Sequence, residues 1–245
     1  MTPLDFLAGL AAPVVEAHGS VSCVRDDLLP GGSKTRFLPF LIPPGTSEVV
    51  FGGPFCGGAP VALSVLGQSI GLRVSLFYAA RKHLHPRQIA AQAHGAVLHE
   101  VPFGYMSNVQ AKARAYAQAA GSFFLPLGFD IPAAEDPFVE VMRSVRASVG
   151  SPEQVWCATG SGMLARCLGR AFPDSEIRAV AVGLRSRWSR QEFPANVKVT
   201  PASLPFEREA RGVAPFPTCP NYDLKAWLRC AEEGRGSRLF WNVLG

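Results

Sequence analysis

Short apolar runs alternate along most of the chain with longer segments whose apolar positions recur at helical spacing. The apolar runs predict strands at residues 48–51, 73–78, 96–101, 122–126, 154–158, 177–182 and 237–242. The helical spacing predicts helices at residues 59–72, 86–94, 108–120, 137–149, 162–172 and 223–233. Residues 19–25 alternate between apolar and polar positions, which predicts an edge strand. Strands that alternate with helices of about ten residues or more predict an α/β protein with parallel sheets.

Residues 183–220 interrupt this pattern, because they are rich in proline, arginine and aromatic residues. We expect them to form an irregular surface segment. Ligands of parallel sheets bind in loops at the carboxyl ends of the strands. Candidate chemistry is therefore expected where such loops carry glycine, hydroxyl or charged residues.

Composition limits the class of protein. The chain has 245 residues, of which 48% are hydrophobic and 18% charged, which predicts a globular protein of one large domain or two lobes. No run of about eighteen apolar residues predicts a membrane span, and the N-terminus lacks the basic region of a signal peptide. The six cysteines are scattered, which predicts free thiols in the cytoplasm. The five histidines form no ligand pattern, so we predict no metal site.

A glycine-rich hexapeptide, Gly31-Gly32-Ser33-Lys34-Thr35-Arg36, precedes the apolar run at residues 37–42. Two glycines let the backbone turn tightly and approach a ligand. Partial desolvation of Lys34 favours its neutral amine, which can form a Schiff base with an aldehyde. Taken in isolation, the hexapeptide also fits a polar turn whose lysine lies in water.

A second motif, Ala158-Thr159-Gly160-Ser161-Gly162, lies between a predicted strand and a predicted helix. Backbone N–H groups of such a turn, together with a helix N-terminus and two hydroxyls, can form an anion site. The spacing of a dinucleotide-binding loop is absent, and an ordinary strand-to-helix turn remains the alternative.

A third motif, Tyr222-Asp223, precedes the last predicted helix and the closing strand. An aspartate at the start of a helix most often serves as its N-cap, and an adjacent tyrosine usually packs.

In this order, the three motifs resemble the fold-type II enzymes that depend on pyridoxal 5'-phosphate, whose fold is called tryptophan synthase β-like. They are most similar to the branch of aminocyclopropane-carboxylate deaminase and D-cysteine desulfhydrase. Arg25-Asp26-Asp27 followed by residues 31–36 is similar to that branch's "RED…GGNKTR" segment. Residues 158–162 are similar to its phosphate loop, and Tyr222-Asp223 followed by Lys225 to its "VYEGK" segment.

The resemblance implies two open-sheet lobes with the cofactor between them, in a shortened form of the fold. Residues 1–50 and 150–245 would form the larger lobe and residues 51–149 the smaller. Lys34 would be the Schiff-base lysine and Tyr222 would lie beside the ring. The phosphate would be held by the loop Ala158, Thr159, Gly160, Ser161 and Gly162.

Asp223 would then bond the pyridine nitrogen and keep it protonated. A pyridinium is a strong electron sink and stabilises a quinonoid carbanion at Cα of an amino acid. We therefore predict a lyase dependent on pyridoxal phosphate that acts at Cα of an amino-acid substrate.

The chain departs from the branch at the loop that reads "GGxQSNQ" there, which supplies donors to the substrate carboxylate. Here the loop carries Phe55, Cys56, Gly57 and Gly58, which we predict to bind the substrate. Most side-chain donors are missing, although the N–H groups of Gly57 and Gly58 can still bind an anion. An apolar loop over the carboxylate would favour loss of CO2, so we predict a decarboxylase in preference to a deaminase or desulfhydrase.

Basic residues cluster at residues 81–87 and at Arg185, Arg187, Trp188 and Arg190. Arginine beside an aromatic residue suits phosphate contact with base stacking, although either cluster also fits solvated loop charges. Small pyridoxal phosphate enzymes that resemble this family occur in bacteriophage pathways that hypermodify thymine in DNA, in which an amino acid on the base is decarboxylated, and we take this reaction as the leading specific hypothesis. The predicted partners are an amino-acid-type substrate and DNA with a modified base. We also predict a homodimer. The predicted location is the cytoplasm, which would be the host cytoplasm if the protein is viral. A small-molecule deaminase or desulfhydrase and a non-catalytic pyridoxal phosphate-binding regulator remain alternatives.

Overall fold

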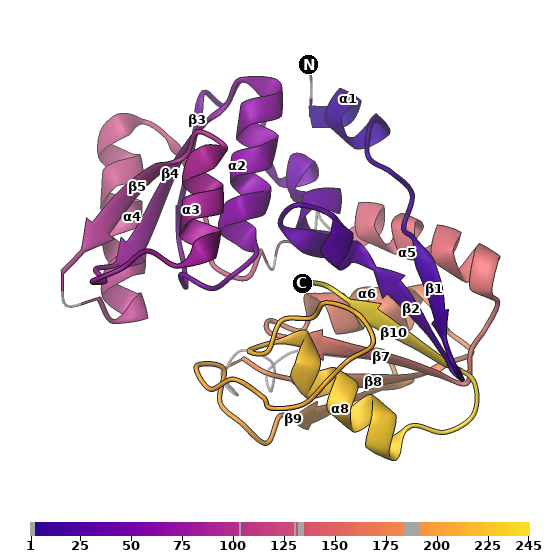
Figure 1. Ribbon diagram of the computed structural model, residues 1–245. Helices are drawn as coiled ribbons and strands as arrows, with labels where there is room; N and C mark the ends of the chain where they lie inside the picture. The colour runs from indigo at the N-terminus through magenta and orange to yellow at the C-terminus, as the bar shows by residue number, and fades with distance from the viewer. Residues whose placement is uncertain (1–2, 103, 130, 132–134, 184–191) are drawn as a thin grey trace. The chain divides into compact units, whose positions relative to one another are not determined.

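The computed structural model describes residues 3–102, 104–129, 131, 135–183 and 192–245 (Figure 1). The chain divides into two compact units. The first unit contains residues 1–10 and 29–134, and the second contains residues 11–28 and 135–245. This division differs from the expected lobe boundaries at three places, because residues 1–10 and 29–50 group with the first unit and residues 135–149 with the second.

The second unit is built on a mixed sheet. Its described strands follow the order β1 (Val15–His18), β2 (Val21–Arg25), β10 (Arg238–Asn242), β7 (Gln154–Thr159), β8 (Glu176–Ala181) and β9 (Val197–Pro201). The β1 and β2 strands are antiparallel, and every other neighbouring pair is parallel. Parallel pairing aligns the carboxyl ends of β2, β10, β7 and β8 along one edge of the sheet.

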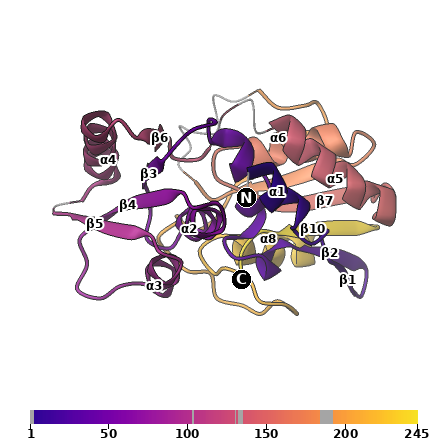
Figure 2. The same ribbon diagram turned by 90° about the horizontal axis from the view of Figure 1, so that it is seen from above.

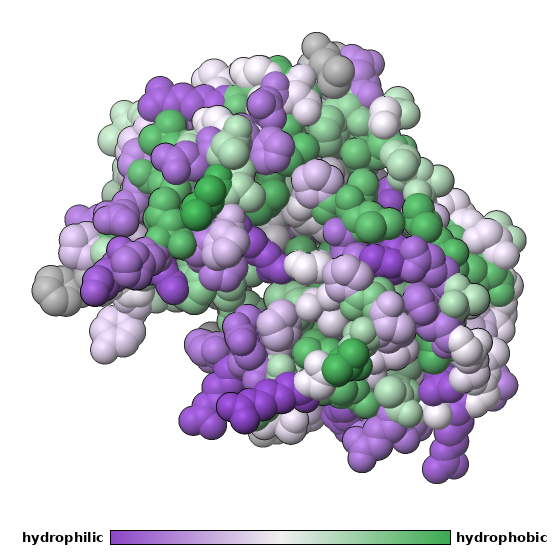
Figure 3. Space-filling view, viewed as in Figure 1, coloured by the Kyte–Doolittle hydropathy of each residue, from purple (hydrophilic) through white to green (hydrophobic). Residues whose placement is uncertain are grey.

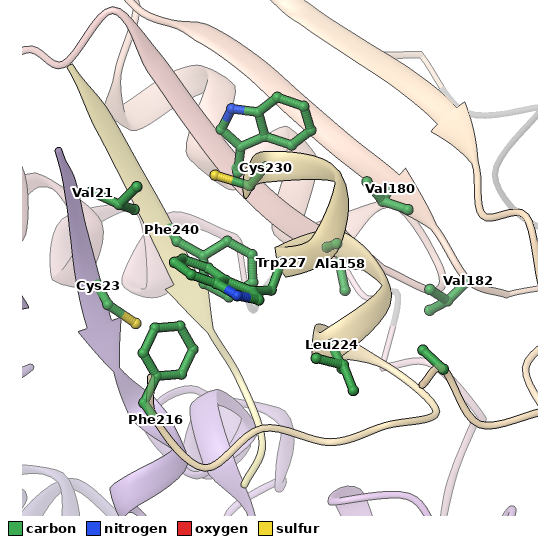
Figure 4. Close-up of a cluster of buried hydrophobic side chains, with 13 residues drawn as sticks. Val21, Cys23, Ala158, Val180, Val182, Phe216, Leu224, Trp227, Cys230 and Phe240 are labelled. Atoms are coloured by element: carbon green, nitrogen blue, oxygen red, sulfur yellow. The ribbon is translucent and has the colours of Figure 1, made fainter. Parts of the chain in front are cut away.

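Helices cover both faces of this sheet (Figure 1). One face carries α5 (Glu135–Val149) and α6 (Met163–Ala171), and the other carries α8 (Asp223–Glu233). Figure 4 shows the core on the α8 side, where Trp227 and Leu224 of the helix lie against Phe240 of β10 and Ala158 of β7. On the opposite face, the ring of Phe138 in α5 meets the Trp241 ring edge-on.

The first unit contains a smaller, fully parallel sheet. Its described strands follow the order β5 (Val97–Val101), β4 (Arg73–Ala79), β3 (Glu48–Gly52) and β6 (Phe123–Leu125). Figure 2 shows α4 (Met106–Ala120) on one face and α2 (Ala59–Ile70) with α3 (Pro86–Ala93) on the other. Shorter elements complete this unit: α1 (Pro3–Ala8), η2 (Gly32–Arg36) and η3 (Leu38–Leu41). All five residues of β3 are buried, as expected for a central strand covered on both faces.

Two sequence predictions of structure were wrong. The strand predicted at residues 19–25 is not an edge strand, because β2 lies between β1 and β10. The segment at residues 183–220 is not wholly irregular, because β9 forms within it and extends the sheet beyond β8. A half-exposed edge strand of five residues carries too few apolar positions to stand out among the prolines around it.

Polar and apolar side chains are intermixed over the face of the molecule in Figure 3. Several large apolar side chains are exposed at scattered positions, of which Tyr105 and Val213 are the most exposed. Within the described ranges, no helix combines the length and apolar character needed to cross a membrane.

Candidate functional site

The carboxyl edge of the six-stranded sheet gathers the candidate residues of the second unit. Register pairs Asn242 at the end of β10 with Arg25 at the end of β2. Thr159 at the end of β7 pairs with Ala181 at the end of β8. The loops that follow these strands are the part of a parallel sheet where ligands bind.

The loop after β7 has donors suited to an anion. Gly162 is the N-cap of α6, with a φ of 100° and no side-chain cap. Trp156 and Ala158 face α8, so strand alternation turns Thr159 toward the α6 face. The Thr159 side chain is 1% exposed, and its Oγ1 has no hydrogen-bond partner within the described chain. A buried hydroxyl beside the N–H groups of a helix N-terminus fits an anionic oxygen.

Tyr222 joins this loop from a distant part of the sequence. Its phenolic oxygen accepts a hydrogen bond from the backbone of Gly160. Burial, and secondarily the charge of Asp223, raise the pKa of Tyr222 well above its usual value. The phenol therefore keeps its proton throughout the physiological pH range.

Asp223 is fully buried at the first position of α8, and Tyr222 occupies the N-cap. The aspartate is therefore not the helix N-cap that its position suggested as an alternative. Its Oδ1 accepts the N–H of Val243 at 3.2 Å and its Oδ2 accepts the N–H of Leu244 at 3.0 Å. These bonds hold the carboxylate beside the residues that follow β10.

The Arg25-Asp26-Asp27 segment stabilises the same edge of the sheet. Arg25 donates from Nε and Nη2 to the two oxygens of Asp27, at 2.9 and 2.8 Å. The Trp241 indole N–H donates to Oδ2 of Asp26 at 3.1 Å. The Trp241 bond connects the end of β2 to β10, and the Arg25–Asp27 pair holds the segment that follows β2 in place.

Lys34 belongs to the first unit, where it lies in η2 and is half-buried. The hexapeptide therefore forms a short 3₁₀ helix and not an exposed turn. Gly31 precedes η2 with a φ of 83°, and a Cβ at that position would lie 2.4 Å from the backbone of Ala62. Glycine at position 31 thus allows η2 to pack directly on α2, and this packing positions Lys34.

The loop between β3 and α2 carries Phe55, Cys56, Gly57 and Gly58, and Gly58 is the N-cap of α2. The guanidinium carbon of Arg81 lies 3.4 Å from the centroid of the Phe55 ring, with the His85 ring 5.3 Å from it on centroids. Arg87 donates from Nη1 to the Cys56 carbonyl. The basic residues 81–87 therefore lie against the predicted substrate loop.

Sequence reasoning missed this contact, although it held the needed signal. The two segments follow β3 and β4, which are parallel neighbours. Their carboxyl ends therefore share one edge, which places the loops side by side. The segment predicted to contact nucleic acid, with Arg185, Arg187, Trp188 and Arg190, lies outside the described residues. Across the described ranges, no three metal-ligating side chains group together.

Comparison of whole structures decides the fold. The chain superimposes on an ACC deaminase homologue with a TM-score of 0.81 and 15% identity, covering 100% of this chain and 94% of that one. The superposition on a threonine deaminase from T.th. has a TM-score of 0.73 and 14% identity, covering 99% of this chain and 96% of that one. The superposition on diaminopropionate ammonia lyase from Escherichia coli has a TM-score of 0.66 and 11% identity, covering 99% of this chain and 85% of that one. The chain has the tryptophan synthase β-like fold.

The fold class predicted from the sequence is thereby confirmed. No protein-family model and no curated protein matches the sequence. Within the tryptophan synthase β-like fold, the loop at 159–162, Tyr222 and Asp223 are brought together in the second unit. Lys34 and the loop at 55–58 both lie next to α2 in the first unit.

Proposed function

We propose that this chain is a pyridoxal phosphate-dependent lyase that acts at Cα of an amino acid. The observation that carries this proposal is the buried carboxylate of Asp223, held next to the anion-binding loop after β7. Tyr222 links the two, because it contacts Gly160 and directly precedes Asp223. A fold shared with an ACC deaminase homologue, a threonine deaminase and an ammonia lyase supports the same class of reaction.

The residues present fit the cofactor. Its phosphate matches the donors at the start of α6, where the buried Thr159 Oγ1 has no partner among the described residues. Its pyridine nitrogen matches the buried carboxylate of Asp223, because a carboxylate is the group that favours the protonated pyridine. Its aldehyde matches the half-buried amine of Lys34.

Bound pyridoxal phosphate draws electrons from Cα of an amino acid joined to its aldehyde. Asp223 would strengthen this effect by holding a proton at the pyridine nitrogen. Tyr222 keeps its own proton because burial raises its pKa, and it would pack beside the ring. Lys34 would hold the cofactor through its amine, and the same amine would move a proton at Cα.

We favour loss of ammonia or of a side-chain leaving group. The guanidinium groups of Arg81 and Arg87 lie against the loop at Phe55 and Cys56, where they would stabilise a substrate carboxylate. The positive charge of the two guanidinium groups would stabilise the carboxylate, whereas loss of CO2 is promoted when the carboxylate is desolvated without such a partner.

Decarboxylation of an amino acid attached to thymine in DNA is the second candidate. It is supported by the side chains of the loop at residues 53–58, of which Cys56 alone is polar and is a weak donor. An amino acid attached to DNA would also suit the net charge of +5.

Borohydride reduction tests the cofactor assignment. The purified protein is expected to be yellow, and reduction followed by peptide mass spectrometry should find a pyridoxyl group on Lys34. Lys34→Ala should lose the covalent label, whereas Lys112→Ala, at an exposed lysine of the same unit, should keep it. A label on another lysine, or no label at all, would refute the proposal.

Product analysis separates the two reactions. The protein is incubated with D-cysteine, aminocyclopropane-carboxylate and other free D- and L-amino acids, and separately with amino-acid-modified oligonucleotides. Release of ammonia, sulfide or a keto acid supports the favoured reaction. A mass loss equal to CO2 on the oligonucleotide supports the second candidate, and a bound chromophore without any product would indicate a regulator.

A further inference from the structure

Arg166 is the fourth residue of α6, the helix that begins at the end of the loop after β7. Its side chain is 13% exposed. It donates from Nε and from Nη2 to the same oxygen of Glu135, Oε1, at 2.9 and 2.7 Å. Glu135 therefore binds one edge of the planar guanidinium and fixes its orientation.

The Nη1 group of Arg166 lies beside Gly162, the N-cap glycine of α6. A Cβ built on Gly162 would be 3.3 Å from Nη1 and 3.1 Å from the ring of Phe193. Arginine and the aromatic ring thus border the glycine on which the anion-binding turn depends. The unpartnered hydroxyl of Thr159 opens the same turn three residues earlier.

We propose that Arg166 is a phosphate-binding residue, which adds a charged donor to the neutral N–H groups of the loop at 159–162. This inference rests on the proposed function, because the phosphate belongs to the cofactor. A phosphate monoester carries about −1.5 to −2 charges at neutral pH. Neutral backbone donors bind it less strongly than a guanidinium does, and a guanidinium that is already oriented loses little freedom on binding.

Glu135 does not cancel this role, because it is shared. Arg170, one turn further along α6, contacts Oε2 of Glu135 at 3.4 Å and also donates to Asp136. Part of the Glu135 charge is therefore compensated by Arg170. Arg170 is also an internal control, since it has the same partner on the same helix but lies further from Gly162.

The test compares Arg166→Gln with Arg170→Gln in the full chain. Affinities for pyridoxal phosphate and for pyridoxal, which lacks the phosphate, are measured by absorbance titration, and inorganic phosphate is titrated by calorimetry. Arg166→Gln should weaken binding of pyridoxal phosphate about ten- to hundred-fold and leave pyridoxal unchanged. Arg166→Lys should recover part of the loss. Arg170→Gln, which removes only the indirect compensation of Glu135, should weaken pyridoxal phosphate binding far less than Arg166→Gln and leave pyridoxal unchanged.

Equal weakening of pyridoxal and pyridoxal phosphate in Arg166→Gln would show a merely structural role and overturn the inference. Unchanged affinity for pyridoxal phosphate in that variant would also overturn it. Should the wild-type protein bind inorganic phosphate through Arg166 but not pyridoxal phosphate, the cofactor proposal fails while the anion-binding role of Arg166 stands. Should Arg166→Gln not fold, the same comparison is made with Arg166→Lys, whose unchanged affinity would count against the inference.

Discussion

At the scale of the residue, Asp223 shows how one side chain can serve the fold and the chemistry. Both of its oxygens accept backbone N–H groups of the chain that follows β10, and none of the side chain is exposed. The Coulombic effect of this carboxylate contributes to raising the pKa of Cys157 and Tyr222, after the larger effect of burial. A substitution at this position therefore changes stability as well as any action on a ligand.

Two substitutions separate these effects. Asp223→Ser leaves the N–H groups of Val243 and Leu244 without acceptors and should lower the free energy of unfolding by about 1–3 kcal/mol for each buried donor. Asp223→Asn keeps one acceptor oxygen and should lose less stability. Both variants lack the carboxylate, so both should lose most turnover, measured as product released per bound cofactor. Turnover that instead follows the stability order measured in urea would mean that Asp223 acts only in the fold.

At the scale of the element, η2 depends on close packing against α2. Gly31 has a left-handed φ of 83°, and a Cβ there would lie 2.4 Å from three atoms of Ala62, two of them backbone atoms. A helix backbone cannot move aside as a flexible side chain can. Glycine at position 31 therefore determines where Lys34 lies relative to α2.

Gly31→Ala should separate η2 from α2. Its expected cost is about 1–2 kcal/mol for the left-handed conformation plus a further 1–3 kcal/mol for overpacking, measured by urea unfolding. Gly45→Ala is the matched control, because Gly45 has a φ of 79° with nothing within 4 Å of a Cβ. It should show only the conformational cost. Equal losses in the two variants would mean that contact with Ala62 does not limit position 31.

At the scale of the whole molecule, burial makes the fold sensitive to alkaline pH. Cys23 and Cys157 are buried within the six-stranded unit, and burial raises the pKa of both thiols. It also raises the pKa of Cys167 and of Cys230 to about 12. The unfolded chain loses these protons near pH 9, whereas the folded chain retains them. The unfolded state thus binds fewer protons above that pH, so the free energy of unfolding falls as pH rises.

Urea unfolding from about pH 8 to about pH 10.5 measures this dependence, because that range includes the ordinary thiol pKa of about 8.5. Each thiol should contribute a decline of up to about 1.4 kcal/mol per pH unit above its unfolded pKa. The double variant Cys167→Ala/Cys230→Ala lacks the contribution of two thiols, so its free energy of unfolding should decline less steeply with pH. An unchanged slope in that variant would contradict the assignment of the pH dependence to these buried thiols.

Local pattern was sufficient for most elements of the fold. Strands such as β3 and β7 are short apolar runs, and helices such as α2 carry their apolar residues at helical spacing. These patterns belong to neighbouring residues, so they can be read without knowing the partner surfaces. β9 was missed because an edge strand has little burial to impose a pattern, and the wrong edge assignment for β2 arose because β1 and β10 lie elsewhere in the sequence.

The sequence by itself determined the identity of the motifs: the glycines and lysine at 31–34, the loop at 158–162 and the pair Tyr222-Asp223. Only the tertiary structure decided their partners. The contact of Tyr222 with Gly160 and the bonds of Asp223 to the residues after β10 join segments that the sequence separates. The physical reason is that such contacts follow from which strands become neighbours in a sheet. That order is set by long-range pairing and burial, which no local pattern encodes.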